Sequence, residues 1–501
     1  MSLMKQLFRK KFPSELVTAH LTKCLTAWDL GLMGVGAIIG TGIFVLTGIA
    51  AATQAGPAVI ISFILSGLAC GFAALSYAEL SASVGGSGSA YGYSYAAFGE
   101  FIAWIIGWDL ILEYAVSVEA VANGWAGYVK DALKTMGIGL PHQFTKGPLV
   151  LLHTDKMTAV QKLLPANTCS FTFLHDCYHA TGDIVNLPAV LIILVLMALL
   201  VVGVKESVRF NAAMVFIKLL TIAVFIGVAL FHVDFANWKH FMPFGWYGVD
   251  ADGATHGILA GASMVFFAYV GFDAVSTAVG EAKNPQRDAP IGILGSLLFC
   301  TVIYIIVSGL LTLVVPYASL NVSSPVAHAL QLIGVSWASA LVATGVIIGL
   351  TTVMLVLYYG LTRILMSMAG DGLLPKFFSE VNKETHTPIK NTVLCGIIMA
   401  LMAGVIPLDV LADLVNIGTL AAFVLVCAGV IVLRKTKPDM ARPFKTPFGV
   451  LLPSLGIFSC GALIFFLPRI TQLRFIIWLI VGLLIYFLYS AKNSALSAES
   501  L

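Results

Sequence analysis

Charged side chains are scarce in this chain. Only 11% of its 501 residues are Asp, Glu, Lys or Arg, whereas 59% are hydrophobic, and the mean hydropathy is +0.95. A water-soluble protein of this length does not need so much apolar surface, so the composition predicts an integral membrane protein that crosses the bilayer many times. The formal net charge of +3 gives no reason to expect a nucleic-acid partner.

The residue patterns that carry enzyme chemistry are missing as well. The ten histidines lie mostly in loops, and no nucleophile–base pair or metal cluster falls within an apolar segment. The glycine-rich stretch 85–88 lacks the Lys and Ser/Thr of a phosphate-binding loop. The residues from Met1 to Lys11 are basic but lack the apolar core of a cleaved signal peptide. We therefore expect no enzyme, no cofactor, no metal and no cleaved leader.

Apolar segments long enough to cross a bilayer recur along the whole chain. A spanning helix needs about 20 apolar residues. Twelve segments qualify, at 28–52, 57–81, 97–129, 184–204, 210–231, 255–280, 290–316, 334–362, 391–406, 411–433, 450–468 and 473–490. We therefore expect an all-α membrane fold with twelve transmembrane helices.

Basic residues mark one side of the membrane. Lys and Arg gather near both ends of the chain and in alternate connections, whereas the short loops on the other side carry only Lys239, Arg469 and Arg474. Because basic loops stay in the cytoplasm, we expect both termini to be cytoplasmic and the protein to lie in the cytoplasmic (plasma) membrane. The long loop 130–183 is then extracytoplasmic.

Glycines interrupt the first segment. Gly34, Gly36, Gly40 and Gly42 fall within nine positions, and each costs a helix about 1 kcal/mol relative to Ala. An unwound stretch in hydrocarbon is stable only where its N–H and C=O groups find partners. The amides that follow such a break attract a carboxylate. The alternative is close helix packing through the small residues Gly36 and Gly40.

The sixth segment has a second interruption, at 266–273, where Gly271 and Asp273 stand at membrane depth. Paired interruptions at corresponding positions indicate a transporter built from two inverted repeats, with its substrate between them. The expected division is a cytoplasmic segment 1–27, a first five-helix repeat 28–231, a second repeat 255–433, helices eleven and twelve in 450–490, and a cytoplasmic tail 491–501.

Lys218 is the most costly polar residue of the spans. It lies about 13 Å from the cytoplasmic end of its segment, at 1.5 Å per residue. A lysine that alternates between a dry and a wet surrounding can bind and release a proton; the alternative is a permanent ion pair or a snorkelling anchor. Glu113 on the third segment is our expected partner, while Asp109 and Glu119 could simply line a water-filled vestibule.

Two cysteines lie in the outer loop. Cys169 and Cys177 could form a disulfide, remain free thiols, or form a metal site in which His175 and His179 join Cys177. The other six cysteines lie in or beside apolar segments, as small hydrophobic residues do.

Several motifs resemble one known family. They are Gly36-Ala-Ile-Ile-Gly-Thr-Gly-Ile-Phe44, Trp108-Asp-Leu-Ile-Leu-Glu-Tyr114, Phe266-Phe-Ala-Tyr-Val-Gly-Phe-Asp273, Glu281-Ala-Lys-Asn-Pro-Gln-Arg-Asp288, Asp371-Gly-Leu-Leu-Pro375 and Arg442-Pro-Phe-Lys-Thr-Pro447. Together they resemble the cationic amino acid transporter family of the amino acid–polyamine–organocation superfamily. The resemblance implies two inverted five-helix repeats with broken helices one and six, followed by two further helices.

The resemblance also implies a substrate site. The α-carboxylate of an amino acid would meet the amides of Thr41 and Gly42, and its α-ammonium would meet carbonyls around Ile38 on segment one. On segment six, the resemblance implies that carbonyls around Phe267 and Val270 also meet the ammonium, that Ala268 lies in the site, and that Phe267 is a gate. In the proton-coupled branch a lysine at the position of Lys218 replaces sodium, and the family glutamate corresponds to Glu113. Gly370 departs from the family, which usually has Arg before Asp371, so the gating contacts there are open.

The expected function is proton-coupled amino acid uptake by alternating access. Its partners are a free amino acid, protons and the lipid bilayer; the sequence predicts no oligomeric state. The alternatives are an amino acid exchanger, an amino acid sensor without flux, and a channel. Thr351, Thr352, Met354 and Tyr358 are candidates for the side-chain pocket. An apolar pocket suits small neutral substrates, whereas access to Glu113 or Asp273 would suit arginine or lysine.

Overall fold

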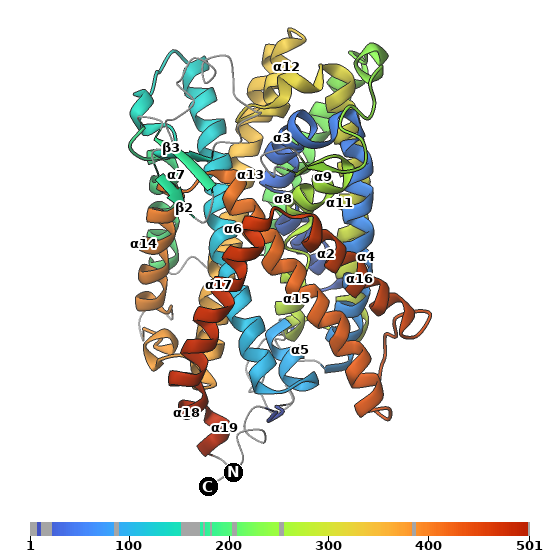
Figure 1. Ribbon diagram of the computed structural model, residues 1–501, viewed down its shortest axis with the longest axis vertical. Coiled ribbons are helices and arrows are strands. Elements are labelled where there is room, and N and C mark those ends of the chain that lie inside the picture. Colours follow the sequence, from blue (N-terminus) through green and yellow to red (C-terminus); the bar gives the residue numbers. More distant parts are fainter. Residues whose placement is uncertain are drawn as a thin grey trace.

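The computed structural model describes residues 8–11, 23–84, 90–151, 171–173, 176–180, 183–202, 208–249, 255–382 and 387–498, which are predominantly helical (Figure 1). Its α-helices are α2 Ala27–Ile38, α3 Thr47–Ala50, α4 Val59–Val84, α5 Ala90–Ala97, α6 Glu100–Thr135, α7 Leu187–Val202, α8 Val208–Leu230, α9 Ile258–Val265, α10 Ala274–Thr277, α11 Pro285–Val314, α12 Pro325–Leu332, α13 Ser336–Gly370, α14 Ile389–Val405, α15 Leu408–Thr436, α16 Leu451–Phe466, α17 Arg469–Ile485, α18 Ala491–Asn493 and α19 Ala495–Ala498.

Long apolar helices dominate the described residues. Eight of them are long and apolar enough to cross a membrane, and four shorter apolar helices (α2, α7, α14 and α16) accompany them. One of the eight, Gly42–Val84, contains parts of two predicted segments. The chain turns within this range at Gly56, whose φ of 63° favours glycine. Large apolar side chains such as Leu298 (67%) and Phe458 (74%) are exposed on the outside, as a lipid-facing surface requires.

Some elements were not predicted from the sequence. Helix α5 precedes α6 where only loop was expected, and α12 lies between α11 and α13. The loop 130–183 contains three strands, β1 Leu149–Leu151, β2 Phe171–Phe173 and β3 Asp176–Ala180, which pair antiparallel in the order β1-β3-β2. A second pair joins β4 Gly248–Val249 to β5 Thr255–His256.

The disulfide and the metal site considered for the loop 130–183 lie outside the described residues. Cys169 and His175 are not described, and Cys177 is described only as part of the backbone of β3. The glycine stretch 85–88 is also outside the described residues.

Segments one and six lie side by side and run in opposite directions. Near one end, the amide of Lys283 donates to the carbonyl of Leu25 at 2.8 Å. Near the other end, the amide of Gly257 donates to the carbonyl of Gln54 at 2.9 Å. Contacts at both ends fix the register between the two segments, and so they fix which residues meet at mid-length.

Helix α4 joins this pair through hydroxyl groups. Ser62 donates to the carbonyl of Ile258 (2.8 Å), and Ser66 donates to that of Ala262 (2.6 Å), both on α9. Tyr269 returns a bond to the carbonyl of Phe63 (2.8 Å) on α4. Such short polar contacts between helices hold segments two and six together without relying on a hydrophobic driving force, which is weak in lipid.

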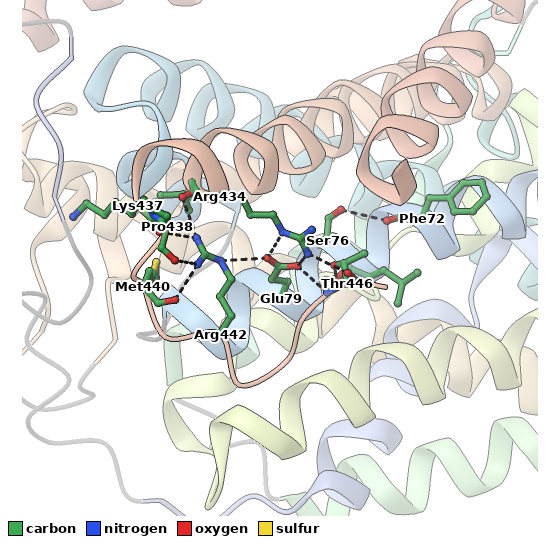
Figure 2. A network of polar contacts seen from close by, with 11 residues as sticks. Phe72, Ser76, Glu79, Arg434, Lys437, Pro438, Met440, Arg442 and Thr446 are labelled. Carbon is green, nitrogen blue, oxygen red and sulfur yellow. Dashed lines mark hydrogen bonds and ion pairs between the residues drawn. The ribbon is translucent and has the colours of Figure 1, made fainter. Parts of the chain in front are cut away.

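A network of charged side chains links α4 to α15 near one end of each helix (Figure 2). The buried carboxylate of Glu79 accepts two hydrogen bonds from Arg434 and one from the amide of Thr446 at 2.8 Å, while Arg442 lies 3.6 Å away. Arg442 also donates to backbone carbonyls near the end of α15, those of Leu433, Lys437, Pro438 and Met440. The connection between α15 and α16 is thereby fixed against α4.

Candidate functional site

Segment one is interrupted at Ile39 and Gly40. Helix α2 begins at a capping box, in which Thr26 and Asp29 bond each other's backbone amides, and it ends at Ile38. Ile39 is extended (φ −74°, ψ 96°), and helical structure resumes at Thr41 with a π-helical turn, Gly42–Leu46. The interruption predicted from the glycines is confirmed.

Segment six is interrupted at Val270 and Gly271. Helix α9 tightens into a 3-10 turn, Phe266–Tyr269, before Val270 takes an extended conformation (φ −59°, ψ 133°). Gly271 has a φ of 114°, a conformation that side chains with a Cβ rarely adopt. The second predicted interruption is also confirmed, and Gly271 provides its backbone conformation.

The two interruptions touch. A Cβ added to Gly42 would lie 2.2 Å from the Cα of Ala268, and one added to Gly271 would lie 3.1 Å from the carbonyl oxygen of Ala37. Only glycine permits this approach of one backbone to the other. The structure therefore brings Gly42 of segment one against Ala268 of segment six, and Ala37 against Gly271. The other predicted site residues, Ile38, Thr41, Phe267 and Val270, neighbour these in the sequence.

The restarted helix offers hydrogen-bond donors at this point. The first amides of a helix have no intrahelical acceptor and carry a partial positive charge. Thr41 adds a fully buried hydroxyl that has no hydrogen-bond partner among the described residues and that packs against Gly124 of α6. Donors of this kind suit a carboxylate.

Carbonyl groups of both segments also lie at the interruptions. The hydroxyl of Tyr304 on α11 is 2.8 Å from the carbonyl oxygen of Ile38 and 2.9 Å from that of Ala268. The carbonyl of Phe267 accepts a bond from the amide of Val270 at 3.3 Å. The side chain of Phe267 is 5% exposed, and its role as a gate stays a prediction.

Lys218 is buried against the end of α2. Its ammonium donates to the carbonyl of Gly36 at 2.6 Å, its side chain is 1% exposed, and its stem fills the space that a Cβ on Gly349 would take. The end of a helix carries a partial negative charge, which stabilises a cation. A helix end as the partner of Lys218 was not anticipated from the sequence.

Glu113 lies in a different polar group. The carboxylates of Asp273 and Asp109 are close enough to interact with it electrostatically, and Thr419 of α15 lies beside it. Tyr114 donates to Asp273 at 3.4 Å. All three carboxylates are nearly inaccessible. The expected communication between Glu113 and Lys218 stays a prediction.

Helix α13 supplies residues near the interruption. The side chain of Val353, which we did not predict, lies 3.7 Å from where a Cβ on Gly40 would be. Thr351 accepts a bond from the indole of Trp125 at 3.0 Å, and Tyr358 donates to the carbonyl of Thr392 on α14 at 2.5 Å. The hydroxyl of Tyr358 is thus directed to segment nine, and Val353 is the better candidate for a substrate contact.

Asp371 has contacts that the motif alone did not reveal. Lys11 pairs with its carboxylate at 2.8 Å, and Tyr91 on α5 donates to it at 2.7 Å. Burial, and next the negative charge of Asp371, raise the pKa of Tyr91 well above its ordinary value, so its hydroxyl remains a donor. Lys11 thereby supplies a positive charge beside Asp371, where Gly370 has none.

Comparison with known proteins agrees with this geometry. Residues 25–488 match the model of a family described as amino acid permease. The chain is 46% identical to a methylthioribose transporter of Bacillus subtilis over 99% of this chain and 100% of that protein. It is also 46% identical to the branched-chain amino acid permease BcaP of the same organism, over 98% and 99%. A vacuolar cationic amino acid transporter 4 of Arabidopsis thaliana is 36% identical over 84% of this chain and 64% of that protein.

Proposed function

Because this chain belongs to the amino acid permease family, we propose that it moves a free amino acid across the cytoplasmic membrane by alternating access. In this proposal twelve helices span the membrane, 28–231 and 255–433 are inverted repeats, 450–490 adds two helices, and 1–27 and 491–501 face the cytoplasm. The opposite directions of segments one and six support the inverted relation.

The contact between the two interruptions carries the proposal. A zwitterion needs donors for its carboxylate and acceptors for its ammonium within a few ångströms of each other. In this proposal, the amides of Thr41 and Gly42 bind the carboxylate. The ammonium is bound by the carbonyls around Ile38, Phe267, Ala268 and Val270. Backbone groups recognise these two ends in every amino acid, so selectivity among substrates falls to side chains such as Val353.

Proton coupling is assigned to Lys218. While it is charged, its ammonium stabilises the end of α2 through the carbonyl of Gly36. Loss of the proton removes that charge–dipole attraction and leaves the end of α2 freer to move. Binding and release of one proton would thus alter the same helix end that contacts the substrate, and Glu113 is the proposed second group on the proton path.

The preferred substrate in this proposal is a neutral, branched amino acid. Val353 near Gly40 is apolar, and BcaP matches nearly the whole chain. A second candidate is methylthioribose, because the transporter of that name is equally similar. Methylthioribose has neither carboxylate nor ammonium, so it would offer the donors at Thr41 only neutral oxygen atoms.

Uptake into proteoliposomes tests the proposal. With an inward proton gradient, the wild-type protein should accumulate radiolabelled L-leucine, and excess methylthioribose should not compete. Lys218→Ala should abolish gradient-driven accumulation, whereas Lys239→Ala, at an exposed position, should not. If Lys218→Ala still accumulates leucine, the coupling role is wrong; counterflow without net uptake would instead identify an exchanger.

A further inference from the structure

Tyr304 lies where the two interrupted segments meet, yet it belongs to neither. It is on α11, its side chain is fully buried, and its hydroxyl is within 2.9 Å of one carbonyl oxygen from each segment. Both carbonyls, those of Ile38 and Ala268, stand where helical structure ends or tightens, so they depend on groups outside their own helix for partners.

The Tyr304 hydroxyl and the carbonyls of Ile38 and Ala268 together have more acceptor sites than donor protons. A tyrosine hydroxyl has one proton, so it can donate fully to only one of the two carbonyls at a time. Three oxygen atoms therefore share a single proton in a buried place. Each carbonyl has two lone pairs, so both can accept a further donor while they remain beside the hydroxyl.

Two aromatic rings pack against the ring of Tyr304. The ring of Phe63 lies 5.5 Å from it and that of Tyr269 lies 5.4 Å from it, both measured between ring centres. This packing fixes where the hydroxyl points, because a tyrosine side chain has few rotatable bonds and its ring is confined on two sides.

We propose that Tyr304 is a substrate-positioning residue, whose hydroxyl holds the carbonyls of Ile38 and Ala268 in place so that they accept the ammonium of the substrate together. This inference rests on the proposed function and adds a residue to its site. The shortage of protons among the three oxygens favours a guest with several N–H groups, and an ammonium supplies three.

Two matched variants test the role. Tyr304→Phe removes the hydroxyl but keeps the ring. Tyr128→Phe is the control, because it also removes one buried hydroxyl bond of 2.8 Å to a backbone carbonyl, but that bond ends on Phe44 inside the helical turn Gly42–Leu46. Both variants should lose similar thermal stability, so any difference between them in transport reports on the site.

The KM for L-leucine should rise about 3- to 10-fold in Tyr304→Phe, the range that corresponds to one hydrogen bond, with little change in maximal rate. Tyr128→Phe should change the KM less than twofold. Inhibition by 4-methylpentanoate, which is leucine without its ammonium, should be the same in Tyr304→Phe as in the wild type.

Other outcomes overturn the inference. An unchanged or lowered KM in Tyr304→Phe, an equal rise in both variants, or altered inhibition by 4-methylpentanoate would each show that Tyr304 does not position the ammonium. A wild-type protein that takes up none of the twenty amino acids would instead refute the proposed function, which separates the two failures.

Discussion

Gly42→Ala is the most informative single substitution in this protein. The added Cβ would lie 2.2 Å from the Cα, 2.5 Å from the Cβ and 2.7 Å from the amide nitrogen of Ala268. Carbon atoms pack at about 3.5–4.0 Å, so the backbone of segment six must retreat by roughly 1.3 Å. No rotamer change can relieve the clash, because two of the three atoms belong to the backbone.

Two free-energy terms oppose each other at this position. Alanine in place of glycine favours a helix by about 1 kcal/mol. Forced repacking of a tight interior costs about 1–3 kcal/mol or more, so the clash dominates. A shift of about 1 Å at a site that orients small groups lowers rates on the order of 100-fold. We therefore expect a folded but less stable protein whose leucine uptake is nearly lost.

Gly40→Ala is the matched control. Its Cβ would meet nothing closer than Val353 at 3.7 Å, an ordinary contact. Initial rates of leucine uptake, normalised to the protein that elutes as a single species in detergent, should fall less than threefold for this variant. The reasoning is refuted if Gly42→Ala retains more than half of the wild-type rate, or if the two variants behave alike.

Other predictions concern the end of the molecule where α4 and α15 meet. Glu79→Ala leaves the largely buried guanidinium groups of Arg434 and Arg442 without their carboxylate, so it should lower the free energy of unfolding by about 3–5 kcal/mol. Glu380→Ala, in an exposed pair, should lower it by less than about 1 kcal/mol. Equal losses in denaturant titrations would contradict this. Lys11→Ala should cost under about 1 kcal/mol, because the pair is partly exposed. Asp371→Ala should lower the free energy of unfolding more than Lys11→Ala does, because it also removes the acceptor of the Tyr91 hydroxyl. A smaller loss than for Lys11→Ala in the same titration would contradict the contribution of the buried contact between Tyr91 and Asp371.

The sequence was sufficient for the positions of the long helices and of both interruptions. Glycines at 34, 36, 40 and 42 signal the first break directly, and Gly271 with Asp273 signals the second. These signals are local, because they depend on helix propensity and on the cost of a bare backbone in lipid. The family motifs then indicated that the two breaks belong to one site.

Contacts between distant segments could not be predicted in this way. Nothing in the sequence around Tyr304 distinguishes it from a tyrosine that only packs, and its role follows from the register of segments one and six. Lys218 was expected beside a carboxylate, but a hydrogen bond to the end of α2 requires knowledge of where that helix stops. Helix α5 was missed because its Tyr, Gly and Ser residues give no helical periodicity.

The bridge at Tyr304 also constrains how the chain is made. Tyr304 follows Ile38 by 266 residues, and Lys218 follows Gly36 by 182. At about 5–20 residues per second, a ribosome adds Tyr304 roughly 10–50 s after Ile38. During that interval the carbonyl at the end of the first span has no tyrosine beside it. Synthesis therefore supplies Lys218 to the first span before it supplies Tyr304, which belongs to the second half of the chain.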